Sequence, residues 1–145
     1  MSYPAPGSDQ HGHPGAPGYA PAPRIGQMGF TEAVRSVLTQ YATFSGRARR
    51  SEYWWFYLAT VLADAVAMLI DSALGTPVLA ILLMVALLIP GVAVTFRRLH
   101  DAGRTAWWLL IGFVPIAGAI ILLVFFCTDS DMATNKWGPS PKYGA

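Results

Sequence analysis

Three apolar runs dominate the chain, and each is long enough to cross a membrane as a helix. They cover residues 53–74, 78–96 and 107–127, and only two residues within them are charged. An α-helix rises 1.5 Å per residue, so about 20 residues cross a hydrocarbon core of about 30 Å. We therefore expect an all-α integral membrane protein with three transmembrane helices, the second and third kinked at Pro90 and Pro115.

A shorter segment of mixed character precedes the first run. Its apolar residues recur every three or four positions: Phe30, Val34, Val37, Leu38 and Tyr41. This spacing places an apolar stripe along one side of a helix that is too short and too polar to cross the membrane. We expect an amphipathic interfacial helix at about residues 30–42, lying on the membrane surface or against the transmembrane helices.

The composition agrees with a membrane protein that has polar ends. Of the 145 residues, 54% are hydrophobic and 12% are charged, whereas soluble domains have about 25% charged residues. Residues 1–27 are rich in proline and glycine and contain few aliphatic side chains, so we expect a disordered tail there. A second, short tail is expected at residues 142–145.

Arginine residues gather beside the apolar runs. The two clusters are Arg47, Arg49 and Arg50 before the first run, and Arg97, Arg98 and Arg104 after the second. Positive residues in short loops favour the cytoplasmic side. With three spans, this rule places the N-terminus inside the cell and the C-terminus outside.

If the first two spans are antiparallel neighbours, the two clusters meet at one face of the membrane. The candidate contact residues are Arg47, Arg50, Glu52, Arg97, Arg98, His100, Asp101 and Arg104. Each arginine near anionic lipid contributes about 1 kcal/mol, and its guanidinium pairs with phosphate through two hydrogen bonds. The sequence thus favours a structural or interaction role in which this face contacts anionic headgroups or a partner. An alternative stays open, in which the clusters set the topology and form salt bridges such as Glu52 with Arg97 or Arg98.

Asp64 lies near the middle of the first run. A carboxylate at this depth costs about 2.5 to 3.5 kcal/mol, so we expect it to face protein or a water-filled cavity. One interpretation is a hydrogen-bonded residue that holds helices together. The alternative function is a component of a small-solute, ion or proton transport system that uses Asp64. Asp71 is nearer the end of the run and is expected at the interface.

No motif in the sequence indicates an enzyme, a cofactor or a metal site. His100 and Asp101 resemble an orienting dyad, but His100 is the only histidine beyond residue 27, and the motifs of hydrolases and nucleotide-binding loops are absent. The single Cys127 forms no intrachain disulfide. A net charge of +2 does not indicate nucleic acid. The expected partners are the lipid bilayer, anionic lipids, and a second copy or another membrane protein.

Three motifs in this chain occur together in one known family. They are Phe44-x-Gly46-Arg47-x-x-Arg50-x-x-Tyr53-Trp54; Arg97-Arg98-Leu99-His100-Asp101 with Trp107-Trp108; and Cys127 with Asn135 and Gly138-Pro139-x-Pro141. Over residues 33–141 the chain resembles the bacterial family catalogued as domain of unknown function 805. The resemblance implies a small protein of the bacterial cytoplasmic membrane, and it supplies no reaction or substrate. The chain departs from the family's usual residues at Trp137, at Ser140 and at positions 129–131.

Overall fold

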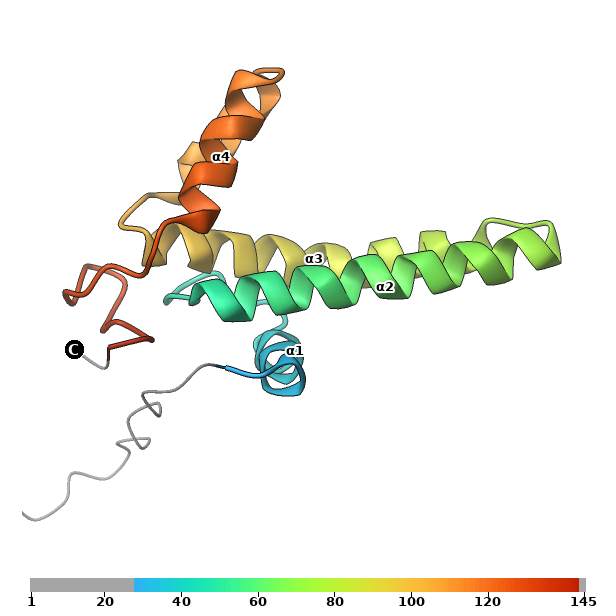
Figure 1. The fold of residues 1–145 in the computed structure, drawn as a ribbon, viewed down its shortest axis with the longest axis horizontal. Coiled ribbons are helices and arrows are strands. Elements are labelled where there is room, and N and C mark those ends of the chain that lie inside the picture. The colour runs from blue at the N-terminus through green and yellow to red at the C-terminus, as the bar shows by residue number, and fades with distance from the viewer. Residues whose placement is uncertain (1–27, 144–145) are drawn as a thin grey trace, which may run out of the picture.

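The computed structural model describes residues 28–143, which form an all-α structure (Figure 1). Its elements are α1 (Phe30–Thr39), α2 (Arg50–Leu74), α3 (Val78–Asp101), the 3-10 helix η1 (Ala106–Phe113) and α4 (Ala117–Cys127). The disordered tail expected at residues 1–27 lies outside the described residues, as does the end of the tail expected at 142–145.

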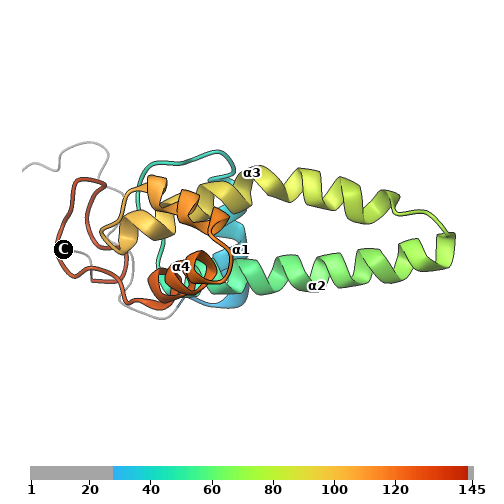
Figure 2. The same cartoon turned by 90° about the horizontal axis from the view of Figure 1, so that it is seen from above.

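The helices α2 and α3 lie side by side and antiparallel along the long axis of the molecule (Figures 1 and 2). They contain 25 and 24 residues, and their most apolar stretches have mean hydropathies of 1.6 and 2.7. Both are long and apolar enough to cross a membrane. Two of the expected spans are therefore present. The helices extend into the flanking polar residues, because α2 begins at Arg50 and α3 ends at Asp101.

Asp71 holds the turn between α2 and α3. The left-handed backbone of Gly75, with φ of 70°, ends α2. The Asp71 carboxylate accepts hydrogen bonds from the backbone N–H groups of Leu79 at 3.0 Å and Ala80 at 2.8 Å. The first N–H groups of a helix have no partner within it. Asp71, which the sequence only placed near the interface, thus caps the start of α3.

The expectation of a third continuous helix over residues 107–127 is wrong. The run is divided into η1 and α4, which reverse direction at residues 114–116 and pack against each other (Figure 1). We call this pair the apolar hairpin. Pro115 disfavours a helical conformation at Val114, which is extended, and Ile116 has a positive φ of 67°. The 11 residues of α4 span about 16 Å, roughly half of a hydrocarbon core.

The C-terminal segment, residues 128–143, follows the apolar hairpin and returns to the end of the α2–α3 pair where α2 begins. The Arg49 guanidinium donates a hydrogen bond to the backbone oxygen of Pro141, and Asp131 N–H donates to the Asp101 oxygen at 3.1 Å. The apolar hairpin therefore begins and ends near the same end of the α2–α3 pair, where α2 begins and α3 ends. The expectation that the two ends of the chain lie on opposite sides is contradicted within residues 28–143, because the third run turns back at residues 114–116.

Helix α1 crosses α2 and α3 on the side away from the apolar hairpin (Figures 1 and 2). Its buried residues are Ala33 and Val37, which confirms the amphipathic helix, although it ends at Thr39 rather than near residue 42. Val37 packs with Phe56 and Val94 in a small core. Most other apolar side chains of α2 and α3 are exposed, as expected for surfaces that face lipid.

Candidate functional site

The charged residues predicted to meet gather at one end of the α2–α3 pair, which we call the arginine end. Buried residues of this group are Arg47, Glu52, Arg97, Arg98, His100 and Asp101. Exposed residues of the group are Arg50 and Arg104. The meeting of the two clusters is thus confirmed, but most of their side chains point into the protein.

Asp101 is the centre of this arrangement, and its side chain is fully buried. One carboxylate oxygen accepts a hydrogen bond from Arg47 Nε at 3.0 Å. The other accepts from Arg98 Nη1 at 2.8 Å and from Ser130 Oγ at 2.6 Å. One carboxylate therefore pairs with two buried guanidinium groups. The remaining N–H groups of the two arginines need other acceptors, because a buried charge without hydrogen bonds is costly.

Backbone oxygens of the C-terminal segment supply these acceptors for Arg47. Its Nη1 donates to the oxygens of Ala133 at 2.8 Å and Gly138 at 3.3 Å. Its Nη2 donates to the oxygens of Asp131 at 2.6 Å and Asp101 at 3.3 Å. Arg47 therefore joins the segment before α2, the end of α3 and the C-terminal segment.

Arg98 and Arg50 donate hydrogen bonds to carbonyl groups at the end of α4. Arg98 donates to the oxygens of Phe126, at 3.2 Å from Nε, and Thr128. Arg50 Nη1 donates to the oxygen of Cys127 at 3.2 Å. The last carbonyls of a helix have no partner within it and carry partial negative charge. Arg98 and Arg50 therefore cap α4 and fix the base of the apolar hairpin.

Arg97 joins α3 to α1 and α2. Its Nη1 lies 3.0 Å from Oε1 of both Glu52 and Gln40. Ser36 Oγ donates to the same oxygen of Glu52 at 3.0 Å. The predicted salt bridge between Glu52 and Arg97 is thus confirmed, and it is buried. We refer to Arg47, Arg97, Arg98, Glu52 and Asp101 as the arginine network.

His100 does not orient Asp101. Its Nδ1 lies 3.1 Å from the backbone oxygen of Gly46, and its ring stacks on Trp137 at 4.5 Å between centroids. Asn135 Nδ2 donates to the backbone oxygen of His100 at 3.0 Å. These contacts give the ring a packing role between the segment before α2 and the C-terminal segment.

Asp129 lies at the centre of an exposed group of ion pairs at the edge of the arginine network. Its carboxylate accepts hydrogen bonds from Lys142 Nζ at 2.6 Å and Tyr143 Oη at 3.2 Å, and Arg50 Nη2 lies 3.3 Å away. The hydrogen bond from Lys142 is the main reason that the pKa of Asp129 falls to about 2. The same contact raises the pKa of Lys142.

Arg104 lies at the base of the apolar hairpin and is exposed. Its guanidinium carbon is 4.4 Å from the centre of the Phe125 ring and 5.5 Å from that of Trp108. Arginine favours such positions over aromatic faces. Of the predicted arginine contact residues, Arg104 and Arg50 alone retain side chains that face outward.

Several contributors to the network were not found by sequence reasoning. They are Ser36, Gln40, Ser130 and the backbone oxygens of residues 125–138. Ser130 lies in the stretch where the chain departs from the family's usual residues, and this departure is the one signal that pointed there. Backbone acceptors leave no mark in a pattern of side chains.

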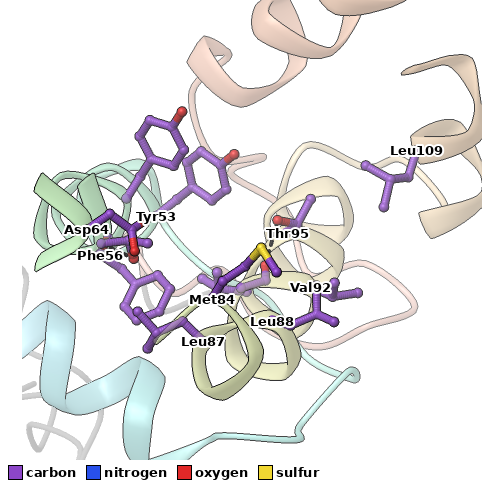
Figure 3. A pocket seen from close by; sticks show the side chains of 13 residues that line it. Tyr53, Phe56, Asp64, Met84, Leu87, Leu88, Val92, Thr95 and Leu109 are labelled. Carbon is purple, nitrogen blue, oxygen red and sulfur yellow. Dashed lines mark hydrogen bonds between the residues drawn. The ribbon is translucent and has the colours of Figure 1, made fainter. Parts of the chain in front are cut away.

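Asp64 lies apart from the arginine network. It borders a cavity of ≈ 390 Å³ between α2 and α3, which Figure 3 shows from close by. Among residues 28–143, no three His, Cys, Asp or Glu side chains are placed to hold a metal ion. The structure thus separates a buried polar network at the arginine end from one carboxylate between the spans.

These features are typical of an integral membrane protein. Two long apolar helices form its spans, and the buried arginine network joins them to the base of the apolar hairpin at one end. Residues 41–139 match the model of the family described as "Protein of unknown function (DUF805)". The chain belongs to this family, and it is a protein of the bacterial inner membrane.

Two relatives among curated proteins each match this chain over 112 residues. Inner membrane protein YhaI of Escherichia coli strain K12 is 45% identical over 112 residues, which cover 76% of this chain and 95% of that protein. Inner membrane protein YhaH of the same strain is 40% identical over 112 residues, covering 73% and 93%. No solved structure matches the chain.

Proposed function

We propose that this protein is a structural and interaction component of the inner membrane that contacts anionic lipid headgroups at its arginine end. The observation that carries this proposal is the position of Arg104, exposed beside Phe125 at the base of the apolar hairpin. Arg50, whose side chain is 45% exposed, lies next to the end of α4. The proposed contact surface is therefore Arg50 and Arg104, smaller than the eight residues named from the sequence.

The apolar hairpin supports this proposal because it places exposed apolar surface beside Arg104, at the arginine end of the α2–α3 pair. Its tip is strongly exposed, with Phe113 at 84% and Ile116 at 78%, and exposed apolar surface of this kind is typical of a contact with lipid or with another membrane protein. Trp107 and Trp108 begin the hairpin, and tryptophan favours the level of the headgroups. Arg104 is then placed at the phosphates, where each arginine contributes about 1 kcal/mol of attraction to an anionic leaflet.

The cytoplasmic orientation of this end is part of the proposal. The arginine residues flank both spans at the arginine end, whereas the turn at residues 75–77 has no charge. Positive residues in short loops remain in the cytoplasm. The cytoplasmic leaflet is also the one whose anionic lipids attract basic segments.

The test compares lipid selectivity in two variants that lose the same charge. The purified protein is reconstituted with spin-labelled phosphatidylglycerol or phosphatidylcholine, and the motionally restricted lipid fraction is measured. We expect the wild type to prefer phosphatidylglycerol and R50Q/R104Q to lose this preference. The control R35Q/K136Q removes two exposed cations outside the proposed surface. Retained selectivity in R50Q/R104Q, or equal loss in both variants, would contradict the proposal.

Transport through Asp64 is the second candidate function, and the cavity beside that residue favours it. Two spanning helices do not enclose a path across the membrane, so this function requires a second copy or another membrane protein. Proton flux into liposomes that contain the wild type or D64N tests it. Equal flux in both, no greater than that of empty liposomes, would exclude a proton relay.

A further inference from the structure

Asp64 has no hydrogen bond or ion-pair partner among residues 28–143. It lies in the middle of α2, between the arginine end and the turn where Asp71 caps α3. Asp71 shows how this chain satisfies a buried carboxylate, with two backbone N–H groups within 3.0 Å. Asp64 is half-buried rather than buried, and an ionisable side chain at mid-membrane is costly, which makes its position a candidate for function.

The cavity beside Asp64 lies between α2 and α3, and Leu109 of η1 borders it on a third side (Figure 3). Its volume of ≈ 390 Å³ falls within the range of small-molecule sites. Exposed side chains such as Tyr57 and Met84 form its rim. Because these side chains lie on the outer faces of two helices that are long and apolar enough to cross a membrane, the open side of the cavity would face lipid rather than water.

The walls of the cavity are apolar and aromatic apart from a few polar groups. Tyr53, Phe56 and Tyr57 contribute rings, and aromatic faces attract cations. The hydroxyl groups of Thr60 and Thr95 are already used, since they donate to the oxygens of Phe56 at 3.0 Å and Gly91 at 2.7 Å. Asp64 is the one charged residue in the lining, so the walls favour a positive ligand.

We propose that this cavity binds a lipophilic organic cation, whose charged centre pairs with Asp64 and whose apolar body lies between α2 and α3. A metal ion fits poorly, because hard cations require six or more oxygen ligands and the lining offers a single carboxylate. A lipid acyl chain fills apolar space but gives Asp64 no partner. The organic cation satisfies both the carboxylate and the apolar walls.

The test measures binding of radiolabelled tetraphenylphosphonium to the full chain in nanodiscs of phosphatidylcholine, with empty nanodiscs as background. Uncharged lipid is used so that binding does not depend on the headgroup contacts proposed for Arg50 and Arg104. We expect saturable binding of one cation per chain. Tetraphenylborate, which has a similar shape and the opposite charge, should not bind above the background.

Two variants probe the cavity in different ways. D64N keeps the size of the side chain and removes its charge, and we expect about tenfold weaker binding or more. G91L places a side chain in the cavity, because an added Cβ at Gly91 meets no atom within 4 Å, and we expect it to block binding while Asp64 is intact. The control E32Q removes an exposed carboxylate of α1 and should bind as the wild type does.

Three results would overturn the proposal. They are wild-type binding no greater than that of empty nanodiscs, equal affinity in D64N and the wild type, and equal binding of tetraphenylborate. Circular dichroism establishes that each variant keeps its helical content. If D64N loses its fold, G91L alone decides, because unchanged binding in G91L would place the ligand outside this cavity.

Discussion

The Nε atom of Arg47 lies 3.0 Å from the carboxylate of Asp101, and the two side chains are 1% and 0% exposed. Arg47 precedes α2 and Asp101 ends α3, so this ion pair joins segments that are 54 residues apart. Through its other N–H groups, Arg47 also holds the C-terminal segment. The pair therefore fixes the arginine end as a single unit.

Replacing Asp101 with Asn is expected to destabilise the protein strongly. The variant leaves the buried Arg47 and Arg98 without a negative partner, and breaking a buried pair in this way costs about 3 to 5 kcal/mol. Thermal unfolding in detergent measures the effect. The control D131N alters an exposed carboxylate and should change stability by less than about 0.5 kcal/mol. Equal unfolding midpoints for D101N and D131N would show that the network contributes little.

Replacing Asp71 with Ala removes the cap of α3. The N–H groups of Leu79 and Ala80 lose their acceptor, and loss of a helix cap costs about 0.5 to 2 kcal/mol. Denaturant titration followed by circular dichroism measures this loss. Ser72, the next residue, is exposed, so S72A is the matched control and should behave as the wild type.

Gly118→Ala is expected to open the apolar hairpin. A Cβ at Gly118 would lie 1.8 Å from the backbone oxygen of Ile111, whereas one at Gly112 would lie 3.2 Å from a terminal methyl group of Leu122. Leu122 can move, but the backbone of η1 cannot do so without separating from α4. The distance between spin labels on η1 and α4 should increase in G118A and stay nearly constant in G112A. An unchanged distance in G118A would contradict this packing.

The topology is tested with single cysteines in a Cys127→Ser background. We expect cysteines at Thr31 and Lys136, both exposed, to be protected from a membrane-impermeant maleimide in intact cells and labelled after permeabilisation. A cysteine at Thr76, in the turn between α2 and α3, should be labelled in intact cells. If the cysteine at position 136 is labelled without permeabilisation while that at 31 is not, the third run crosses the membrane.

The ion pair group at Asp129 predicts a small pH dependence of stability. Because its pKa is lowered from 3.8 to about 2, its contribution is fully present above about pH 5 and is lost as the pH falls from about 4 to 2. The unfolding midpoints of wild type and D129N should therefore differ at pH 6 and converge near pH 2. Asp129 and Lys142 are both exposed, so high salt should reduce the difference at pH 6. A difference that persists at pH 2 would refute the assignment.

The helices that could be predicted from the sequence are those whose apolar residues recur at a helical spacing or form long runs. The periodic apolar residues gave α1, the long runs gave α2 and α3, and the positions of the arginines showed that both clusters meet. The third run was misinterpreted because 21 apolar residues have the same composition whether they form one span or a hairpin. Pro115 was read as a kink, and only the positive φ of Ile116 and the close approach at Gly118 distinguish a reversal.

The burial of the arginines was beyond sequence reasoning for a related reason. A cluster with few acidic neighbours suggests solvent or lipid as the source of acceptors. In the structure, Arg47 and Arg98 share the Asp101 carboxylate, and most of their other acceptors are main-chain oxygens at the end of α4 and in the C-terminal segment. The position of these main-chain oxygens depends on the reversal of the third run, so for Arg47 and Arg98 the first error determined the second.

The apolar hairpin also gives the molecule an unequal shape across the membrane. Near the arginine end the protein occupies the area of α2, α3, the hairpin and α1, whereas near the turn at residues 75–77 it occupies the area of two helices (Figures 1 and 2). In a bilayer crossed by α2 and α3, the protein would displace more lipid from the leaflet at the arginine end than from the leaflet at the turn. In such a bilayer it would therefore be a wedge that is wider in the leaflet at its arginine end.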